Sequence, residues 1–278
     1  MSVLWRGSWA TRIRIASGLV LFTYALLHFL NIGLGLISPY WMEQAQTWRQ
    51  VVTRSLLGGI ILYAALLAHA GLAIIGVARR RTLRMPAWEA VQITLGLVIP
   101  LMLLEHIVHT RVAHQTFGVN DDFGYILALI WGSWDAIVQN LLLLVVWTHG
   151  CVGLHFWLRS TGWWRRSLPY LIGAATLVPG FAFAGFLTEG RRIFTAFQDP
   201  ETRTPLMEAY NWPDQVEFGY LIQLTDYLLI GFWGLLGLAV AFFVWRRISA
   251  GRKSVQIRYV NGPVAASPKG PTLLEMSR

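Results

Sequence analysis

The sequence predicts an all-α integral membrane protein, in which a four-helix transmembrane bundle is followed by two further transmembrane helices. The first observation is composition: the mean hydropathy is +0.50 and only 13% of the 278 residues are charged, about half the share in soluble domains. The second is length, because a spanning helix needs about 20 apolar residues. Six stretches are long enough, at residues 13–37, 55–78, 88–110, 136–158, 168–187 and 225–245.

Positive charge is confined to alternate connections between these stretches. The formal net charge is +9, and the basic residues cluster within residues 6–14, 79–84, 159–166 and 246–253, while the opposite connections are mixed to acidic. Cytoplasmic loops of membrane proteins are enriched in Lys and Arg. We therefore expect a multi-pass protein of the bacterial inner (cytoplasmic) membrane, with both termini cytoplasmic, membrane lipid as its surroundings and no nucleic-acid partner.

The connections divide the chain into three regions. Short connections join the first four stretches, which favours an antiparallel four-helix bundle over residues 1–165. Residues 166–250 add two transmembrane helices and a long periplasmic loop at residues 188–224, which forms either a lid or partner surface or an ordered cap. The single cysteine, Cys151, excludes disulfides and cysteine-ligated metal clusters within this chain.

The composition changes in residues 251–278, which we interpret as a cytoplasmic tail. Apolar and polar residues alternate from Val255 to Tyr259, Asn261 and Gly262 form a typical hairpin turn, and a second short strand fits at residues 264–266. A lone hairpin is too small to fold by itself. The tail therefore predicts the beginning of a soluble domain.

Histidines occur in each of the first four apolar stretches and in neither of the last two. Ionisable side chains are costly inside a membrane, so each is a candidate functional residue. His69 lies 15 residues beyond Arg54 and His149 lies 14 residues beyond Asp135. At about 1.5 Å per residue, both histidines are roughly 21 to 23 Å below the outer face.

A second pair of histidines lies closer to the outer face. His28 is 10 residues before Ser38 and His106 is 11 residues before Phe117, which places both roughly 15 to 17 Å from the outer ends of their helices. A haem between facing helices takes one imidazole on each face. We therefore predict a haem-binding bundle holding two b-type haems, with His28 paired with His106 and His69 paired with His149.

Alternatives to this ligand set remain. His109 competes with His106, and His155 competes with His149, although depth favours the two residues chosen above. A proton relay, or hydrogen-bonded packing, is the alternative role for the buried imidazoles. The arginines near the helix ends either pair with haem propionates or anchor the helices; they are Arg12, Arg14, Arg79, Arg159, Arg54 and Arg111.

Four motifs carry a resemblance to a known family. HAGLA from His69 and HGCVGLHFWLR from His149 resemble the second and fourth haem-binding helices of the dihaem cytochrome b subunit of succinate:quinone oxidoreductases and fumarate reductases. SGLVLFTYALLHF, with His28, and LMLLEHIVHT, with His106, resemble the first and third. The resemblance covers residues 10–165 and implies the same four ligands in the same two pairs.

The tail resembles a different module. VQIRYVNGPVAASPKGPTLLEMSR is similar to the start of a plant-type [2Fe-2S] ferredoxin domain, before its cysteine loop. A six-helix cytochrome b anchor followed by such a module resembles a group of bacterial class III adenylate cyclases. The ferredoxin cysteines and the cyclase's metal-binding aspartates are absent from this sequence. A [2Fe-2S] cluster and catalysis are therefore expected only in a domain downstream.

Two functions follow from these resemblances. The first is a dihaem b-type cytochrome domain that acts as a redox-sensing or quinone-sensing regulatory anchor of an adenylate cyclase, in which case a homodimer is expected through the parent cyclase. The alternative is an electron-transfer membrane anchor of a quinone oxidoreductase of the succinate dehydrogenase or fumarate reductase type. Both readings place no catalytic residue in this chain.

Overall fold

The computed structural model describes residues 3–5, 7–80, 82–251, 254–258 and 264–268. Nearly all of the described chain is helical. The helices are η1 (Val3–Trp5), α1 (Trp9–Gly33), η2 (Leu34–Leu36), α2 (Pro39–Thr53), α3 (Leu56–Ala78), α4 (Ala87–Ile107), the π-helix η3 (Val108–Val112), α5 (Ala113–Phe117), α6 (Phe123–Ile130), α7 (Trp134–Leu158), α8 (Gly162–Gln198), α9 (Pro200–Ala209) and α10 (Gln215–Gly251).

Six helical segments of the described chain are long and apolar enough to cross a membrane, which confirms the prediction of six spans. They are Trp9–Leu36, Leu56–Ala78, Ala87–Phe117, Trp134–Leu158, Gly162–Gln198 and Gln215–Ala250. The third span continues from α4 through the π-helix into α5. The architecture is that of an all-α membrane protein.

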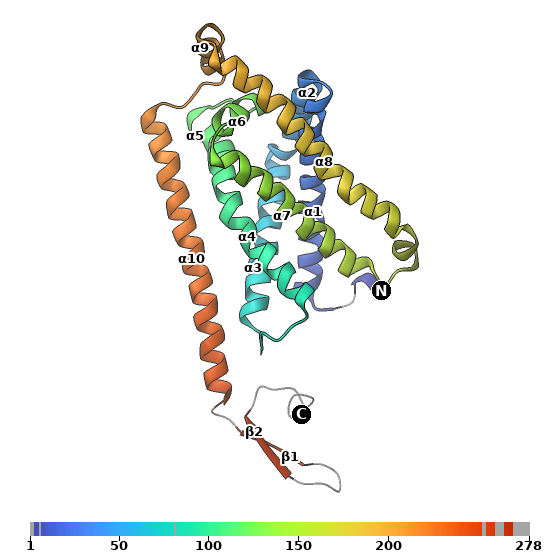
Figure 1. Cartoon of the computed structure of the whole chain (residues 1–278). Coiled ribbons are helices and arrows are strands. Elements are labelled where there is room, and N and C mark those ends of the chain that lie inside the picture. Colours follow the sequence, from blue (N-terminus) through green and yellow to red (C-terminus); the bar gives the residue numbers. More distant parts are fainter. Residues whose placement is uncertain (1–2, 6, 81, 252–253, 259–263, 269–278) are drawn as a thin grey trace.

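The first four spans form a bundle, and the last two lie against it (Figure 1). Helix α1 packs mainly on α3 and α8, while α4 packs mainly on α7. Helices α1 and α4 are therefore diagonal to each other in the bundle, and so are α3 and α7. Helix α10 packs on α3 and α4, and its Arg246 donates a hydrogen bond to the carbonyl of Arg79 at the end of α3 (3.0 Å).

Close packing of α1 on α8 depends on two glycines. A Cβ at Gly185 would lie 2.1 Å from the carbonyl oxygen of Ile32, and a Cβ at Gly33 would lie 2.1 Å from the Phe181 ring. Small residues of this kind let two membrane helices approach closely. The α1–α8 contact therefore fixes the outer half of α1, which also carries His28.

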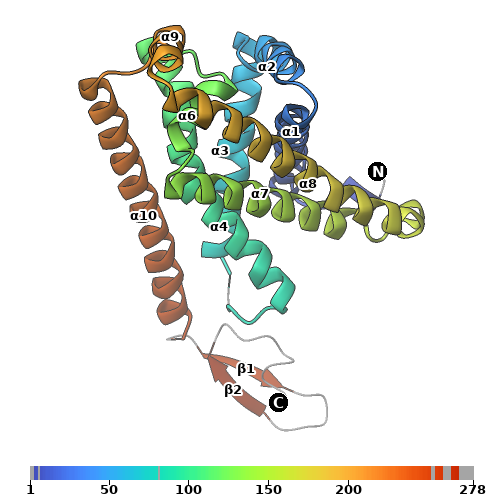
Figure 2. The same ribbon diagram turned by 45° about the horizontal axis from the view of Figure 1, so that its top comes forward.

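The outer connections are more helical than the sequence predicts. The connection predicted at residues 188–224 is largely helical and contains the end of α8, helix α9 and the start of α10. Helices α2, α6 and α9 gather at one end of the bundle in both views (Figures 1 and 2). The connection at residues 188–224 is too polar to span the membrane. Its apolar side chains nevertheless pack against the end of the bundle, as expected of an amphipathic segment.

Buried aromatic residues hold this outer layer together. Tyr125 of α6 packs edge-on against Tyr210 and Trp212, with ring centroids 6.4 and 5.1 Å away, and Leu221 of α10 is fully buried in the same cluster. The backbone N–H of Asn120 donates to the carbonyl of Tyr210 (2.9 Å). These contacts favour the ordered-cap interpretation of residues 188–224 over a lid.

The tail contains the predicted hairpin. Strands β1 (Ser254–Arg258) and β2 (Val264–Pro268) pair antiparallel, with Val255 opposite Ser267 and Ile257 opposite Ala265. The predicted turn at Asn261 and Gly262, and the resemblance to a ferredoxin domain beyond it, fall outside the described residues.

Candidate functional site

The two rings of the outer pair of predicted ligands lie close together across the bundle. The imidazole centroids of His28 on α1 and His106 on α4 are 6.2 Å apart, with the ring planes at 54°. The His28 ring also stacks on Tyr24 (5.9 Å) and on Phe123 (6.1 Å). Aromatic walls of this kind fix the position of the imidazole and keep water away from it.

The inner pair has the same separation. His69 on α3 and His149 on α7 have ring centroids 6.2 Å apart, with the ring planes at 88°. The structure therefore brings together the four histidines that the sequence selects, in the two pairs that were predicted, and each pair joins diagonal helices.

This separation suits an iron atom between two imidazoles. A metal–imidazole bond is about 2 Å and the ring centroid lies about 1 Å behind its nitrogen, so two imidazoles on opposite sides of one metal have centroids about 6 Å apart. A direct hydrogen bond between the two rings would bring the centroids closer, to about 5 Å, because nitrogen atoms bonded through one proton are about 3 Å apart. The separation of the rings in each pair therefore fits a metal atom coordinated by both imidazoles.

Hydrogen bonding at the ring nitrogens also fits bound ligands. Nδ1 of His69 lies 3.1 Å from the carbonyl oxygen of Arg14, and such a bond leaves Nε2 free to coordinate a metal. Nδ1 of His28 and Nδ1 of His149 are buried and have no hydrogen-bond partner among the described residues. A buried polar atom without a partner is costly, but Nδ1 of His109 is in the same state, so only the bond at His69 distinguishes a predicted ligand.

Two glycines make room for the inner pair. A Cβ added at Gly18 of α1 would lie 3.0 Å from Cε1 of His69, and a Cβ at Gly96 of α4 would lie 3.0 Å from Cε1 of His149. Each imidazole therefore rests on bare backbone of the neighbouring helix. The sequence prediction did not include either glycine.

Two glutamines accompany the histidines and were also missed. Gln92 of α4 donates to the backbone carbonyl of His149 (3.0 Å), and Gln139 of α7 interacts with the side chain of His106. Both are polar residues within apolar stretches, which was the signal available in the sequence. They connect α4 and α7 at both histidine levels.

The competing histidines have other surroundings. The ring of His109 lies 6.3 Å from Phe218 of α10. Nδ1 of His155 accepts a hydrogen bond from Trp164 (3.2 Å) near the inner end of α7. Neither residue faces a partner imidazole, so the geometry favours His106 and His149 as the ligand candidates.

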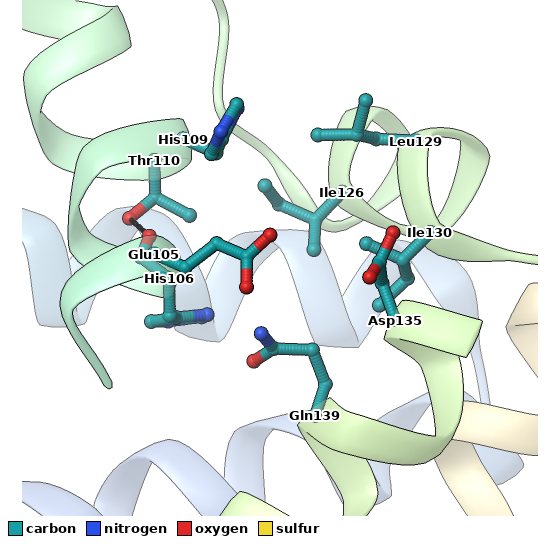
Figure 3. A pocket seen from close by; sticks show the side chains of 9 residues that line it. All are labelled: Glu105, His106, His109, Thr110, Ile126, Leu129, Ile130, Asp135 and Gln139. Atoms are coloured by element: carbon teal, nitrogen blue, oxygen red, sulfur yellow. Dashed lines mark hydrogen bonds between the residues drawn. The ribbon is translucent and has the colours of Figure 1, made fainter. Parts of the chain in front are cut away.

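A cavity opens beside the outer pair. It has a volume of about 90 Å³, and it lies among α4, α6, α7 and the π-helix. Figure 3 shows the carboxylate of Glu105 directed toward this space, with Gln139 and Asp135 across it. The remaining lining residues are His106, His109, Thr110, Ile126, Leu129 and Ile130.

An ion pair between Arg54 and Asp121 lies at the outer end of the bundle. Arg54 donates to both carboxylate oxygens of buried Asp121 at 2.6 Å, and Gln46 donates to the carbonyl of Asp121 (3.0 Å). This occupies Arg54, one of the arginines considered for haem propionates. Arg159, another of them, stacks over Phe156 at 4.8 Å, as expected of an anchoring residue.

The neighbouring Asp122 makes stability depend on pH. Burial, helped by Glu43 and Asp121, raises the pKa of Asp122 to about 6. Because the folded state holds this proton more tightly than the unfolded state, stability falls as pH rises from about 4 to 6. We expect Asp122→Asn to stabilise the protein at pH 7.5 by about 1 to 2 kcal/mol, and by less at pH 4.

Thermal unfolding in detergent at both pH values measures this effect. Asparagine also caps helices well, so the bond from the backbone N–H of Tyr125 to Asp122 (3.0 Å) has an acceptor in the variant. Asp199→Asn is the matched control, because Asp199 caps α9 in the same way but is exposed. A stability gain independent of pH at position 122 would contradict the prediction.

Among the described residues, no three His, Cys, Asp or Glu side chains form a group suited to a free metal ion. The candidate ligands are instead two pairs. Comparison with known proteins finds no matching family model, no matching curated protein and no matching solved structure. The functional interpretation therefore depends on the geometry of the chain itself.

Proposed function

We propose that this chain is a dihaem b-type cytochrome domain of the bacterial inner membrane. The observation that carries the proposal is the arrangement of His28 with His106 and of His69 with His149, each pair 6.2 Å between ring centroids and shared by diagonal helices. Haem supplies a site that takes up and releases one electron. The four helices would hold one haem at each level.

We further propose that the domain regulates an attached cytoplasmic domain according to the redox state of its haems or of a quinone. Helix α10 supports this reading, because it packs on α4 and α3, one helix from each histidine pair, and leads to the hairpin. A change in charge between the pairs would then act on α10. Such coupling needs two states in which α10 packs differently.

An adenylate cyclase is the attached enzyme that the resemblance of helices and tail implies, with a [2Fe-2S] module between. The alternative is an electron-transfer anchor of a quinone oxidoreductase, which two haem levels across the membrane also suit. Cyclic AMP output that follows haem redox state in the full-length protein would select the first function. Haem reduction that requires the quinone pool, without any effect on cyclic AMP, would select the second.

An absorption spectrum of the purified protein tests the cytochrome proposal. We expect sharp α and β bands after reduction and about two haems per chain, because both axial positions of each iron would be filled by imidazole. A colourless protein, purified from cells that supply haem, would contradict the proposal. A proton relay through the histidines would then explain their burial.

A further inference from the structure

Arg49 of α2 is a half-buried cation beside the outer histidine pair. It was not among the arginines that the sequence selected for haem propionates, because the outer connection was not expected to fold back over the bundle. Its charge acts electrostatically on both His28 and His106. The inner pair has a different basic neighbour, Arg14.

Neutral groups hold the guanidinium in place. Nη1 of Arg49 donates to the hydroxyl of Tyr24 (3.2 Å), Nε donates to Oδ1 of Asn31 (3.4 Å), and the guanidinium lies 5.7 Å from the Tyr24 ring centroid. The Asn31 amide is itself oriented by its bond to the carbonyl of Met42 (2.6 Å). These two hydrogen bonds use two of the five N–H groups of the guanidinium.

Arg49 has no neutralising carboxylate within the part of the chain that the structure describes. Among the described residues, no Asp or Glu lies within ion-pair distance of Arg49. Asp121 attracts it from further away, but that carboxylate is bonded to Arg54 at 2.6 Å. Burial lowers the pKa of Arg49, yet an arginine stays protonated in proteins.

A cation taken out of water needs an anion or a full set of hydrogen bonds. Arg49 has free N–H groups, no carboxylate partner and a position next to an imidazole pair that fits haem. We infer that Arg49 binds a propionate carboxylate of the outer haem and so raises the reduction potential of that haem. The inference rests on the proposed function, because it requires the haem.

Charge and contact make separate predictions. A nearby positive charge favours the reduced haem, so Arg49→Gln should lower the midpoint potential of one haem and leave the other unchanged. Arg49→Lys keeps the charge but loses the planar fork that matches a carboxylate. Arg49→Lys should therefore keep the midpoint potential of the outer haem close to that of the unaltered protein. The propionate bending band in the resonance Raman spectrum should shift in both variants.

A spectroelectrochemical titration of the full chain measures both potentials. Arg203→Gln is the matched control, because Arg203 is an exposed arginine of α9 on the same end of the bundle. Tyr24→Phe tests a purely structural role: it removes a hydrogen bond to Arg49 but not its charge, so the potentials should stay near those of the unaltered protein.

The outcomes separate this inference from the proposed function. A protein without haem contradicts the cytochrome proposal itself. A protein with two haems, whose potentials and propionate band are the same with and without Arg49, retains the cytochrome and overturns the inference. Equal shifts in both haems would also overturn it, because they would indicate a general disturbance of the bundle. If Arg49→Gln does not fold, Arg49→Lys still decides through the Raman band.

Discussion

Replacing His69 and His149 together by alanine is expected to reduce the haem content from about two to about one per chain. The centroids of the two rings lie 6.2 Å apart. No other imidazole lies at that depth to coordinate an iron atom between them. The remaining spectrum should be that of the outer haem alone. Replacing His28 and His106 should produce the converse loss, and replacing all four should give a colourless protein.

The competing histidines supply matched controls for this experiment. His155→Ala and His109→Ala remove imidazoles from the same helical segments as His149 and His106, yet neither ring faces a partner. Both variants should keep two haems and six-coordinate spectra. If a control variant loses haem while the variant at the neighbouring predicted ligand keeps it, the histidine of the control is the ligand. Pigment that survives the loss of all four predicted ligands would end the proposal.

Haem content and folding are measured separately. Alanine at a buried histidine leaves a small cavity, which destabilises a protein by a few kcal/mol at most, so a folded protein with less haem is the expected product. Elution as a single species in detergent, combined with a pyridine haemochrome assay, distinguishes ligand loss from unfolding.

Histidine depth was predictable from sequence because the rise of a helix is constant. Counting residues from the helix ends placed His28 with His106 and His69 with His149, and those are the pairs that the structure brings together. The spans themselves follow from apolar length alone. Neither prediction required knowledge of which helix packs on which.

Other parts of the site depend on tertiary packing and could not be read from the sequence. Helix α2 is short and polar, so nothing marked it as the element that brings Arg49 over the outer pair. The π-helix at Val108–Val112 is a local change of helical register. His106 lies beside His28 and His109 beside Phe218, although both line the same cavity. Gly18 and Gly96 lack any signal of their own until the neighbouring helix is known.

A second large effect is expected from Gly185→Ala in α8. The added Cβ would lie 2.1 Å from the carbonyl oxygen of Ile32 and 2.8 Å from Cα of Gly33. Because both are backbone atoms, no side-chain rotation can relieve the clash. Helices α1 and α8 must separate. Overpacking of this kind typically costs about 1 to 3 kcal/mol, and the loss of neighbouring contacts along α1 adds to it.

Gly180→Ala provides the control on the same helix, because a Cβ at Gly180 meets no atom within 4 Å. That variant should unfold at the same temperature as the unaltered protein or slightly above it, since alanine favours helix more than glycine does. Thermal unfolding in detergent compares the two. Equal stability of both variants would show that α8 does not pack on α1 through Gly185.

The same substitution links the fold to the site, because α1 carries His28 five residues before Gly33. Displacing the outer half of α1 moves that imidazole relative to His106, whereas the inner pair is on α3 and α7. We therefore expect Gly185→Ala to weaken the outer haem first, seen as a lower haem content or a five-coordinate component, before the inner haem changes. Loss of the inner haem first would contradict the assignment of the two levels.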